Sequence, residues 1–101
     1  MWEIMVPTVD NAGKPFKTRH HREWDNQVKK ITGGLTIHKP ARGIWVDNSD
    51  SKTYNERMIP VRIACNREQI IEIMKRVKNH YKQIDVLAYK VSDDVIFLSK
   101  I

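Results

Sequence analysis

The segment of residues 31–37, Ile-Thr-Gly-Gly-Leu-Thr-Ile, constrains the fold most, because one hydrophobic periodicity ends there and another begins. Before it, ring-bearing and apolar residues recur at spacings of three and four, as on one face of a helix: His21, Trp24, Val28 and Ile31. After it, apolar residues alternate with polar ones, as in a strand. Because glycine readily adopts the left-handed conformation of a helix end, we expect a helix from near Thr18 to Gly33 or Gly34, followed directly by a strand.

Other segments have the alternating or continuous apolar pattern of strands. They are residues 2–7, 44–46, 53–64 and 86–91, and residues 95–98 form a further, shorter candidate. Pro60 conflicts with a regular strand over residues 53–64, because proline lacks the backbone N–H that a central strand donates. We therefore expect a bulge or a break in this strand at Pro60.

A second helix is predicted directly after Asn66. Asn66 and Gln69 have the spacing of a capping box, and one apolar stripe follows at helical spacing: Ile70, Ile73, Met74, Val77 and Tyr81. The predicted order is therefore strand, helix, two strands, helix and strand. Two helices on one face of an antiparallel sheet accommodate this order with short connections. We predict an α+β fold, a ferredoxin-like βαββαβ sandwich with a short extra C-terminal strand.

The composition limits the class of protein. With 101 residues and 41% hydrophobic content, the chain has the size of one domain with one modest core, so we predict a single ferredoxin-like domain over residues 1–101. The apolar runs are too short to span a bilayer and no signal-peptide pattern precedes the first strand, so we expect a cytoplasmic protein without a membrane segment. Cys65 is the single cysteine, which excludes an intramolecular disulfide and a thiolate zinc site. The formal net charge of +6 permits binding to anions without requiring it.

Three short motifs follow one another in the middle of the chain: Gly34-Leu35-Thr36, Gly43-Ile44-Trp45 and Glu56. Together they resemble the pattern of an uncharacterised bacterial family, a domain of unknown function, over most of residues 16–90. The resemblance implies a ferredoxin-like fold. It implies no activity.

Large side chains on the sheet face away from the helices form the first candidate site. Two helices are too small to cover Met5, Trp45 and Met58 as well as the core, and Arg62 would line the same face. A sheet face left open in this way binds a second copy of the chain, a protein partner or a small ligand. The alternative, that Trp45 packs over its own hairpin, stays open.

Histidines and acids gather at the start of the first predicted helix: His20, His21, Glu23 and Asp25. At a spacing of four, His21 and Asp25 could share one helix face, as metal ligands sometimes do. However, the His-Glu-x-x-His pattern and an evident third ligand are missing, and acids at a helix start are explained by the helix dipole. We therefore favour the structural interpretation and predict no metal site and no cofactor.

Charged residues accompany Glu56 on the predicted sheet: Glu3, Arg57 and Arg62. A clustered carboxylate can serve as a general base, and in a small enzyme His20 or His21 would be its partner. Ion pairs across a solvated sheet face explain the same residues, and we favour them because Pro60 leaves the strand register unfixed. His20, His21 and Glu56 are the catalytic candidates of the enzyme alternative.

Lys75, Lys78 and Lys82 recur at helical spacing and form a candidate anion-binding stripe. Because the aromatic and glycine-rich motifs of common nucleic-acid modules are absent, we favour a solvated lysine face. The phosphate loop, the dinucleotide fingerprint and the nucleophile elbow are also absent from the sequence. We therefore predict a small non-enzymatic binding module that forms a homodimer through its open sheet face, with an unidentified protein or small-molecule partner. The alternatives are nucleic-acid or anion binding through the lysines, and a small enzyme.

Overall fold

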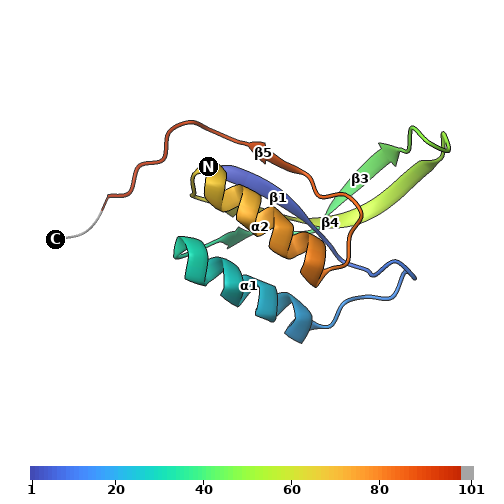
Figure 1. The fold of residues 1–101 in the computed structure, drawn as a ribbon, viewed down its shortest axis with the longest axis horizontal. Helices are drawn as coiled ribbons and strands as arrows, with labels where there is room; N and C mark the ends of the chain where they lie inside the picture. The colour runs from blue at the N-terminus through green and yellow to red at the C-terminus, as the bar shows by residue number, and fades with distance from the viewer. Residues whose placement is uncertain (99–101) are drawn as a thin grey trace.

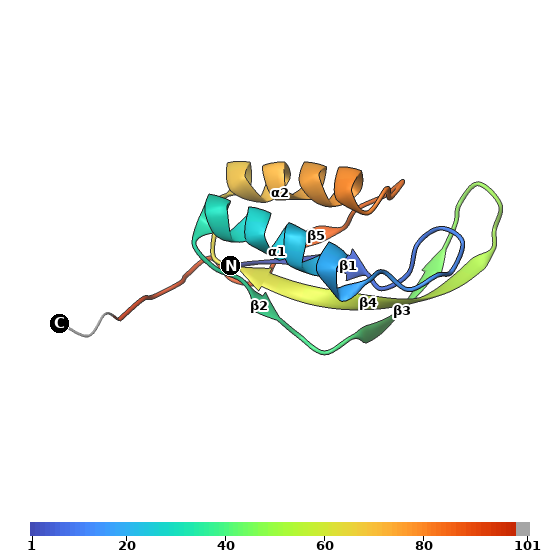
Figure 2. The same cartoon turned by 90° about the horizontal axis from the view of Figure 1, so that it is seen from below.

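The computed structural model describes residues 1–98, which form two helices and five strands (Figure 1). In chain order these are β1 (Trp2–Pro7), α1 (Thr18–Thr32), β2 (Thr36–Ile37), β3 (Ala41–Val46), β4 (Thr53–Ile63), α2 (Arg67–His80) and β5 (Ala88–Lys90). Both helices lie on one face of the sheet (Figure 2). The predicted ferredoxin-like α+β fold is therefore confirmed. Neither helix has the length and apolar content that a membrane-spanning helix needs.

All strand pairs are antiparallel, and β1 lies in the sheet between β4 and β5. β4 is the longest strand, with eleven residues, and only its last six, residues 58–63, pair with β1. On its other side β4 pairs first with β3, over residues 53–58, and then with β2, over residues 61–62. β2 and β3 are thus two pieces of one interrupted edge strand.

β4 continues through Pro60 in regular register, so the expected bulge or break at this residue is wrong. The Pro60 carbonyl accepts a hydrogen bond from the backbone N–H of His38 at 2.9 Å. In an antiparallel strand the N–H and C=O of one residue point to the same side, so the missing N–H faces the connection between β2 and β3. The partner strand is interrupted there, and the ladder with β1 loses no donor.

The core lies between the helices and the sheet. Alternate residues of β1 and β4 point into it, and the predicted stripes of α1 and α2 close it from the other side. Its members are at most 2% exposed: Ile4, Val6, Trp24, Val28, Val61, Ile63, Ile70, Ile73, Val77 and Tyr81. Full burial of one such aliphatic side chain contributes about 1.5–3 kcal/mol, so this single layer of contacts holds the domain together.

α1 begins and ends where the sequence predicts. Gly33 adopts the left-handed conformation, with φ of 86°, and its N–H bonds the Lys29 carbonyl. Lys17, not Thr18, is the residue before the first turn, and no side chain caps the helix there. Thr18 is the first helical residue, at the predicted position.

The predicted extra C-terminal strand over residues 95–98 is also wrong. β5 ends at Lys90, and the N–H groups of Val91 and Ser92 still bond the Met1 carbonyl. The residues from 93 to 98 then run outward from the fold (Figure 1). A strand forms only where a neighbouring strand accepts its backbone hydrogen bonds, and within residues 1–98 no strand pairs with this segment.

The capping box of α2 generates a stability prediction. The Asn66 side chain accepts a hydrogen bond from the Gln69 N–H at 2.8 Å, and the Gln69 side chain accepts one from the Asn66 N–H at 3.0 Å. We expect Asn66→Ala to lower the free energy of unfolding by about 1 kcal/mol in urea denaturation, because it removes the cap. Asn48→Ala, in the exposed β3–β4 turn, is the control and should change little. Equal stability of the two variants would contradict the prediction.

Candidate functional site

The sheet face away from the helices carries all four residues predicted to line it: Met5, Met58, Arg62 and Trp45, which lies opposite Tyr54 on the same side of β4. Arg62 Nε donates to Glu3 Oε1 at 2.9 Å, and the Glu3 side chain is only 8% exposed. Met58 is also buried, so it forms the floor of this face and not its contact surface. Figure 2 shows the connection between β2 and β3 bowing out on this side of the sheet. The exposed apolar part of the face lies further along β4, where β1 has ended.

The β3–β4 hairpin projects beyond both helices, and we call residues 41–57 the hairpin arm (Figure 1). Trp45 and Tyr54 lie opposite each other on one face of the arm and are 40% and 43% exposed. Ile44 and Val46 lie on the other face and are 59% and 62% exposed. The arm therefore presents apolar side chains to solvent on both of its faces.

The Trp45 indole packs over Gly43 of the same strand. A Cβ atom at Gly43 would lie 2.7 Å from Trp45 Nε1, closer than real Cβ contacts come. Glycine is thus required where the ring crosses its own strand, which gives the Gly-x-Trp motif a physical reason. Trp45 packs on its own hairpin and still exposes a large part of its ring.

Glu56 lies opposite Gly43 on the hairpin arm, beside a shallow groove that Arg42, Asn55 and Arg57 line. His20 and His21 do not line this groove, because they belong to the first turn of α1 in the helix layer. The structure does not bring the three catalytic candidates into one cavity.

The predicted lysine stripe is divided. Lys75 and Lys78 lie on α2 and are exposed, whereas Lys82 follows the end of the helix in the left-handed conformation, with φ of 53°. Its carbonyl accepts a hydrogen bond from Asn11, which holds it against the loop of residues 8–17. The three lysines therefore do not form one helix face.

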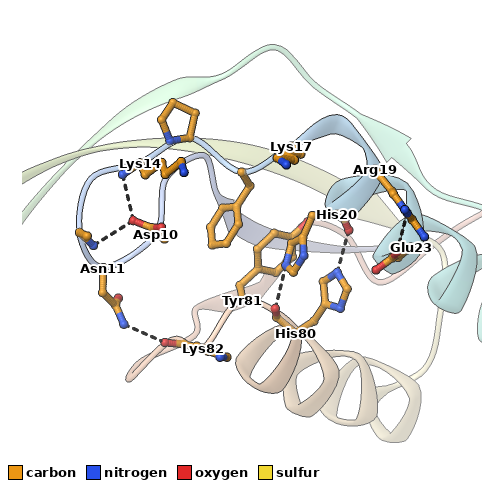
Figure 3. A pocket seen from close by; sticks show the side chains of 13 residues that line it. Asp10, Asn11, Lys14, Lys17, Arg19, His20, Glu23, His80, Tyr81 and Lys82 are labelled. Atoms are coloured by element: carbon orange, nitrogen blue, oxygen red, sulfur yellow. Dashed lines mark hydrogen bonds and ion pairs between the residues drawn. The ribbon is translucent and has the colours of Figure 1, made fainter.

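A larger cavity of about 630 Å³ lies where the loop of residues 8–17 meets the start of α1 and the end of α2 (Figure 3). We call it the helix-end pocket. Four aromatic rings line it: Phe16, His20, His80 and Tyr81. Charged side chains surround them: Asp10, Lys14, Lys17, Arg19, Glu23 and Lys82. The Asp10 carboxylate accepts the backbone N–H groups of Ala12 and Lys14, each at 2.9 Å, and so shapes the loop that delivers Phe16.

Two histidines at the centre of the pocket hold the ends of the helices together. The His20 and His80 rings stack with centroids 3.9 Å apart, and Phe16 stacks on His20 at 4.8 Å. His20 Nε2 donates to the His80 carbonyl at 2.8 Å, and His80 Nε2 donates to the His20 carbonyl at 2.7 Å. Because a carbonyl only accepts, both Nε2 atoms carry a proton, and the lone pair of each neutral ring lies on Nδ1.

His21 has a different partner, the hydroxyl of Tyr81, which lies 2.7 Å from His21 Nδ1. Burial raises the pKa of Tyr81, so the hydroxyl stays protonated. Burial lowers the pKa of His21, and the nearby Asp25 carboxylate opposes that shift. Burial likewise raises the pKa of Asp25. His21 and Asp25 therefore belong to the packing between the helices.

Sequence reasoning missed Phe16, His80 and Tyr81 as members of a site with His20. His80 directly precedes Tyr81, the last residue of the predicted apolar stripe, which is the one sequence signal for its position. Its pairing with His20 follows from the antiparallel packing of two helices whose ends are sixty residues apart in the chain. Local periodicity carries no information on such a pair.

No model of a known protein family and no curated protein matches this sequence. Among solved structures, the chain is similar to a phage SAM lyase in complex with S-methyl-5'-thioadenosine, with a TM-score of 0.65 and 13% identity over 86% of this chain and 75% of that chain. It is similar to the divalent cation tolerance protein CutA1 of Thermus thermophilus, with a TM-score of 0.63 and 10% identity over 93% and 84% of the two chains. It is also similar to the periplasmic divalent cation tolerance protein CutA of Archaeoglobus fulgidus, with a TM-score of 0.63 and 10% identity over 93% of this chain and 85% of that chain. These similarities show the ferredoxin-like fold alone.

The lowered pKa of His21 predicts how stability depends on pH. The unfolded chain, with a histidine pKa of 6.5, takes up a proton that the folded chain resists. This contribution to stability is therefore complete above pH 6.5 and is lost as the pH falls toward the lower folded pKa. Thermal unfolding between about pH 5 and 7.5 should show a smaller pH dependence for His21→Gln than for the wild type. His38→Gln is the control, and equal slopes for His21→Gln and the wild type would refute the prediction.

The contact between Gly43 and Trp45 generates a second prediction. Gly43→Ala should displace the indole and lower the free energy of unfolding by about 1 kcal/mol, the low end for overpacking, because the ring can move toward solvent. The Nε1–H resonance of Trp45 should shift in NMR spectra while that of Trp24 stays in place. Gly34→Ala is the matched control, because no atom lies within 4 Å of the added methyl group. An unmoved Trp45 resonance would show that the contact is not constraining.

Proposed function

We propose that this chain is a small non-enzymatic binding module that acts as a self-associated assembly, with a dimer as its smallest form. A second copy covers the hairpin arm and pairs with the free edge of β3. The observation that carries this proposal is the exposure of apolar side chains on both faces of the arm. A two-stranded ribbon is marginally stable in water by itself, so burial of both faces against another chain stabilises it.

The outer edge of β3 supports a second copy as the partner. β3 pairs with β4 on one side, and within residues 1–98 no strand pairs with its other side. An apolar edge strand with unpaired backbone groups accepts a further strand, and monomeric proteins usually protect such an edge with charges, proline or a bulge. Arg42 is the one charged residue in β3, and the exposed Ile44 and Val46 lie beyond it.

The C-terminal segment supports the same proposal. Residues 95–98, Val-Ile-Phe-Leu, are 39%, 88%, 79% and 97% exposed. They lie at the opposite end of the molecule from the hairpin arm (Figure 1). β-branched and aromatic residues favour strands, and no strand among residues 1–98 lies beside this segment. Docking on a second copy provides the strand neighbour that it lacks.

The shape of the single chain agrees with this interpretation. Its radius of gyration is 14.6 Å. A compact domain of this length has a radius of gyration of about 13 Å. The excess comes from the arm and the C-terminal segment, which extend from opposite ends of the core (Figure 1). The predicted interface is thereby shifted from the middle of the open face, where Met58 is buried, to the arm that carries Trp45.

Light scattering after size-exclusion chromatography tests the proposal. The wild type should have a mass that is a multiple of 11.9 kDa. Val46→Asp on the arm and Phe97→Asp in the C-terminal segment should each shift the mass toward the monomer, because a buried carboxylate without a partner is costly. Ile84→Asp is the matched control, since Ile84 is 82% exposed in the loop before β5 and belongs to neither surface. A wild-type mass of 11.9 kDa at every concentration, or an unchanged mass for Val46→Asp, would contradict the proposal.

A further inference from the structure

We propose that His20, Glu23 and His80 form a binding site for a divalent transition-metal ion, with zinc as the probe that defines it. One nitrogen of each imidazole and one carboxylate oxygen of Glu23 lie within 4.8 Å of one another. The three side chains edge the helix-end pocket, away from the hairpin arm (Figure 3). The site is therefore independent of self-association.

The backbone already brings the three donors together. His20 and Glu23 are three residues apart in α1, a spacing that places both side chains on one face of the helix. His80 is the last residue of α2, and its ring stacks on that of His20 at an interplanar angle of 23°. Because a metal ion lies in the plane of each imidazole that binds it, the two stacked rings must tilt toward a common point to bind one ion.

The hydrogen bonds of the two histidines prepare them as ligands. A histidine that binds a metal usually donates its other ring N–H to a carboxylate or a backbone carbonyl, which fixes the tautomer and the ring orientation. His20 and His80 each make such a bond from Nε2, to the carbonyl of the other residue. Each neutral ring therefore offers the Nδ1 lone pair without first losing a proton.

The donor set selects the class of ion. Two imidazoles and one carboxylate suit zinc and its neighbours nickel and copper, whereas magnesium and calcium prefer oxygen ligands alone. Three protein ligands leave one position of a tetrahedral zinc ion open. Because the three side chains line the helix-end pocket, water or a small ligand can reach an ion bound there.

The Arg19 guanidinium would compete with the metal ion for the Glu23 carboxylate. Its Nε lies 3.4 Å from Glu23 Oε1, and its side chain is 89% exposed. An exposed ion pair contributes little to stability, so an arriving ion can displace the guanidinium into solvent. The negative C-terminal end of the α2 dipole, next to His80, favours a cation at this position, whereas the positive N-terminal end of the α1 dipole, next to His20, opposes it. Arg19 thus lowers the affinity for the ion without blocking it.

Isothermal titration of the full chain with zinc chloride tests the site. The wild type should bind one zinc ion per chain saturably. Glu23→Gln should weaken binding by roughly tenfold or more, since loss of even an outer-shell partner of a ligand costs that much. Glu68→Gln is the matched control, an exposed acid in the first turn of α2, and it should bind like the wild type.

Two further measurements separate a metal site from a merely structural cluster. Arg19→Ala should bind zinc more tightly than the wild type, because it removes the cation that competes for Glu23. In NMR spectra, zinc should shift the imidazole resonances of His20 and His80 and leave those of His38 in place. These tests do not depend on histidine variants, which lose bonds that hold the helix ends together. The proposal would be overturned if the wild type shows no saturable binding, if Glu23→Gln binds zinc as tightly as the wild type, or if Arg19→Ala binds it more weakly.

Discussion

The lengths of two paired strands determine the shape of this molecule. β4 has eleven residues and β1 has six, so β4 is paired on both sides only from Met58 onward. That doubly paired half carries the core residues and is covered by the two helices. The other half pairs with β3 alone and extends as the hairpin arm (Figure 1). Within residues 1–98 no further strand pairs with the arm, and the proposed assembly would supply the missing cover.

The second constraint is the contact between the start of α1 and the end of α2. Tyr81 is 2% exposed and closes the core, while its hydroxyl bonds His21. The reciprocal bonds of His20 and His80 then tie the two backbones to each other. The same residues that fasten the helices thereby place two oriented imidazoles beside Glu23. A structural cluster and a metal site are compatible here, because the structural bonds use Nε2 and leave Nδ1 free.

Features that depend on local sequence could be predicted. The end of α1 at Gly33, the capping box of Asn66 and the buried stripe of α2 follow from residues a few positions apart. The behaviour of Pro60 could not be predicted, because it depends on the interruption of a strand more than twenty residues earlier. Periodicity predicted a strand over residues 95–98, but a strand also requires a neighbour, which sequence alone does not supply.

The candidate sites also differ in whether local sequence or the topology of the fold determines them. Met5, Met58 and Arg62 were placed on one face by strand alternation, which is a local rule. The helix-end pocket combines residues from two helices and a loop, so only the topology reveals it. His20 and Glu23 were visible in the sequence as neighbours of the pair His21 and Asp25, but His80, which lies near both in the fold, was not.

Amide hydrogen exchange along β3 in the wild-type chain tests the central claim, that a second copy covers the hairpin arm. The account predicts that the amide groups of β3 that point away from β4 are protected at high protein concentration. It also predicts that dilution or Val46→Asp removes this protection while the amides of β1 stay protected. Exchange of these β3 amides at the rate of an unfolded peptide, at every concentration, would contradict the account.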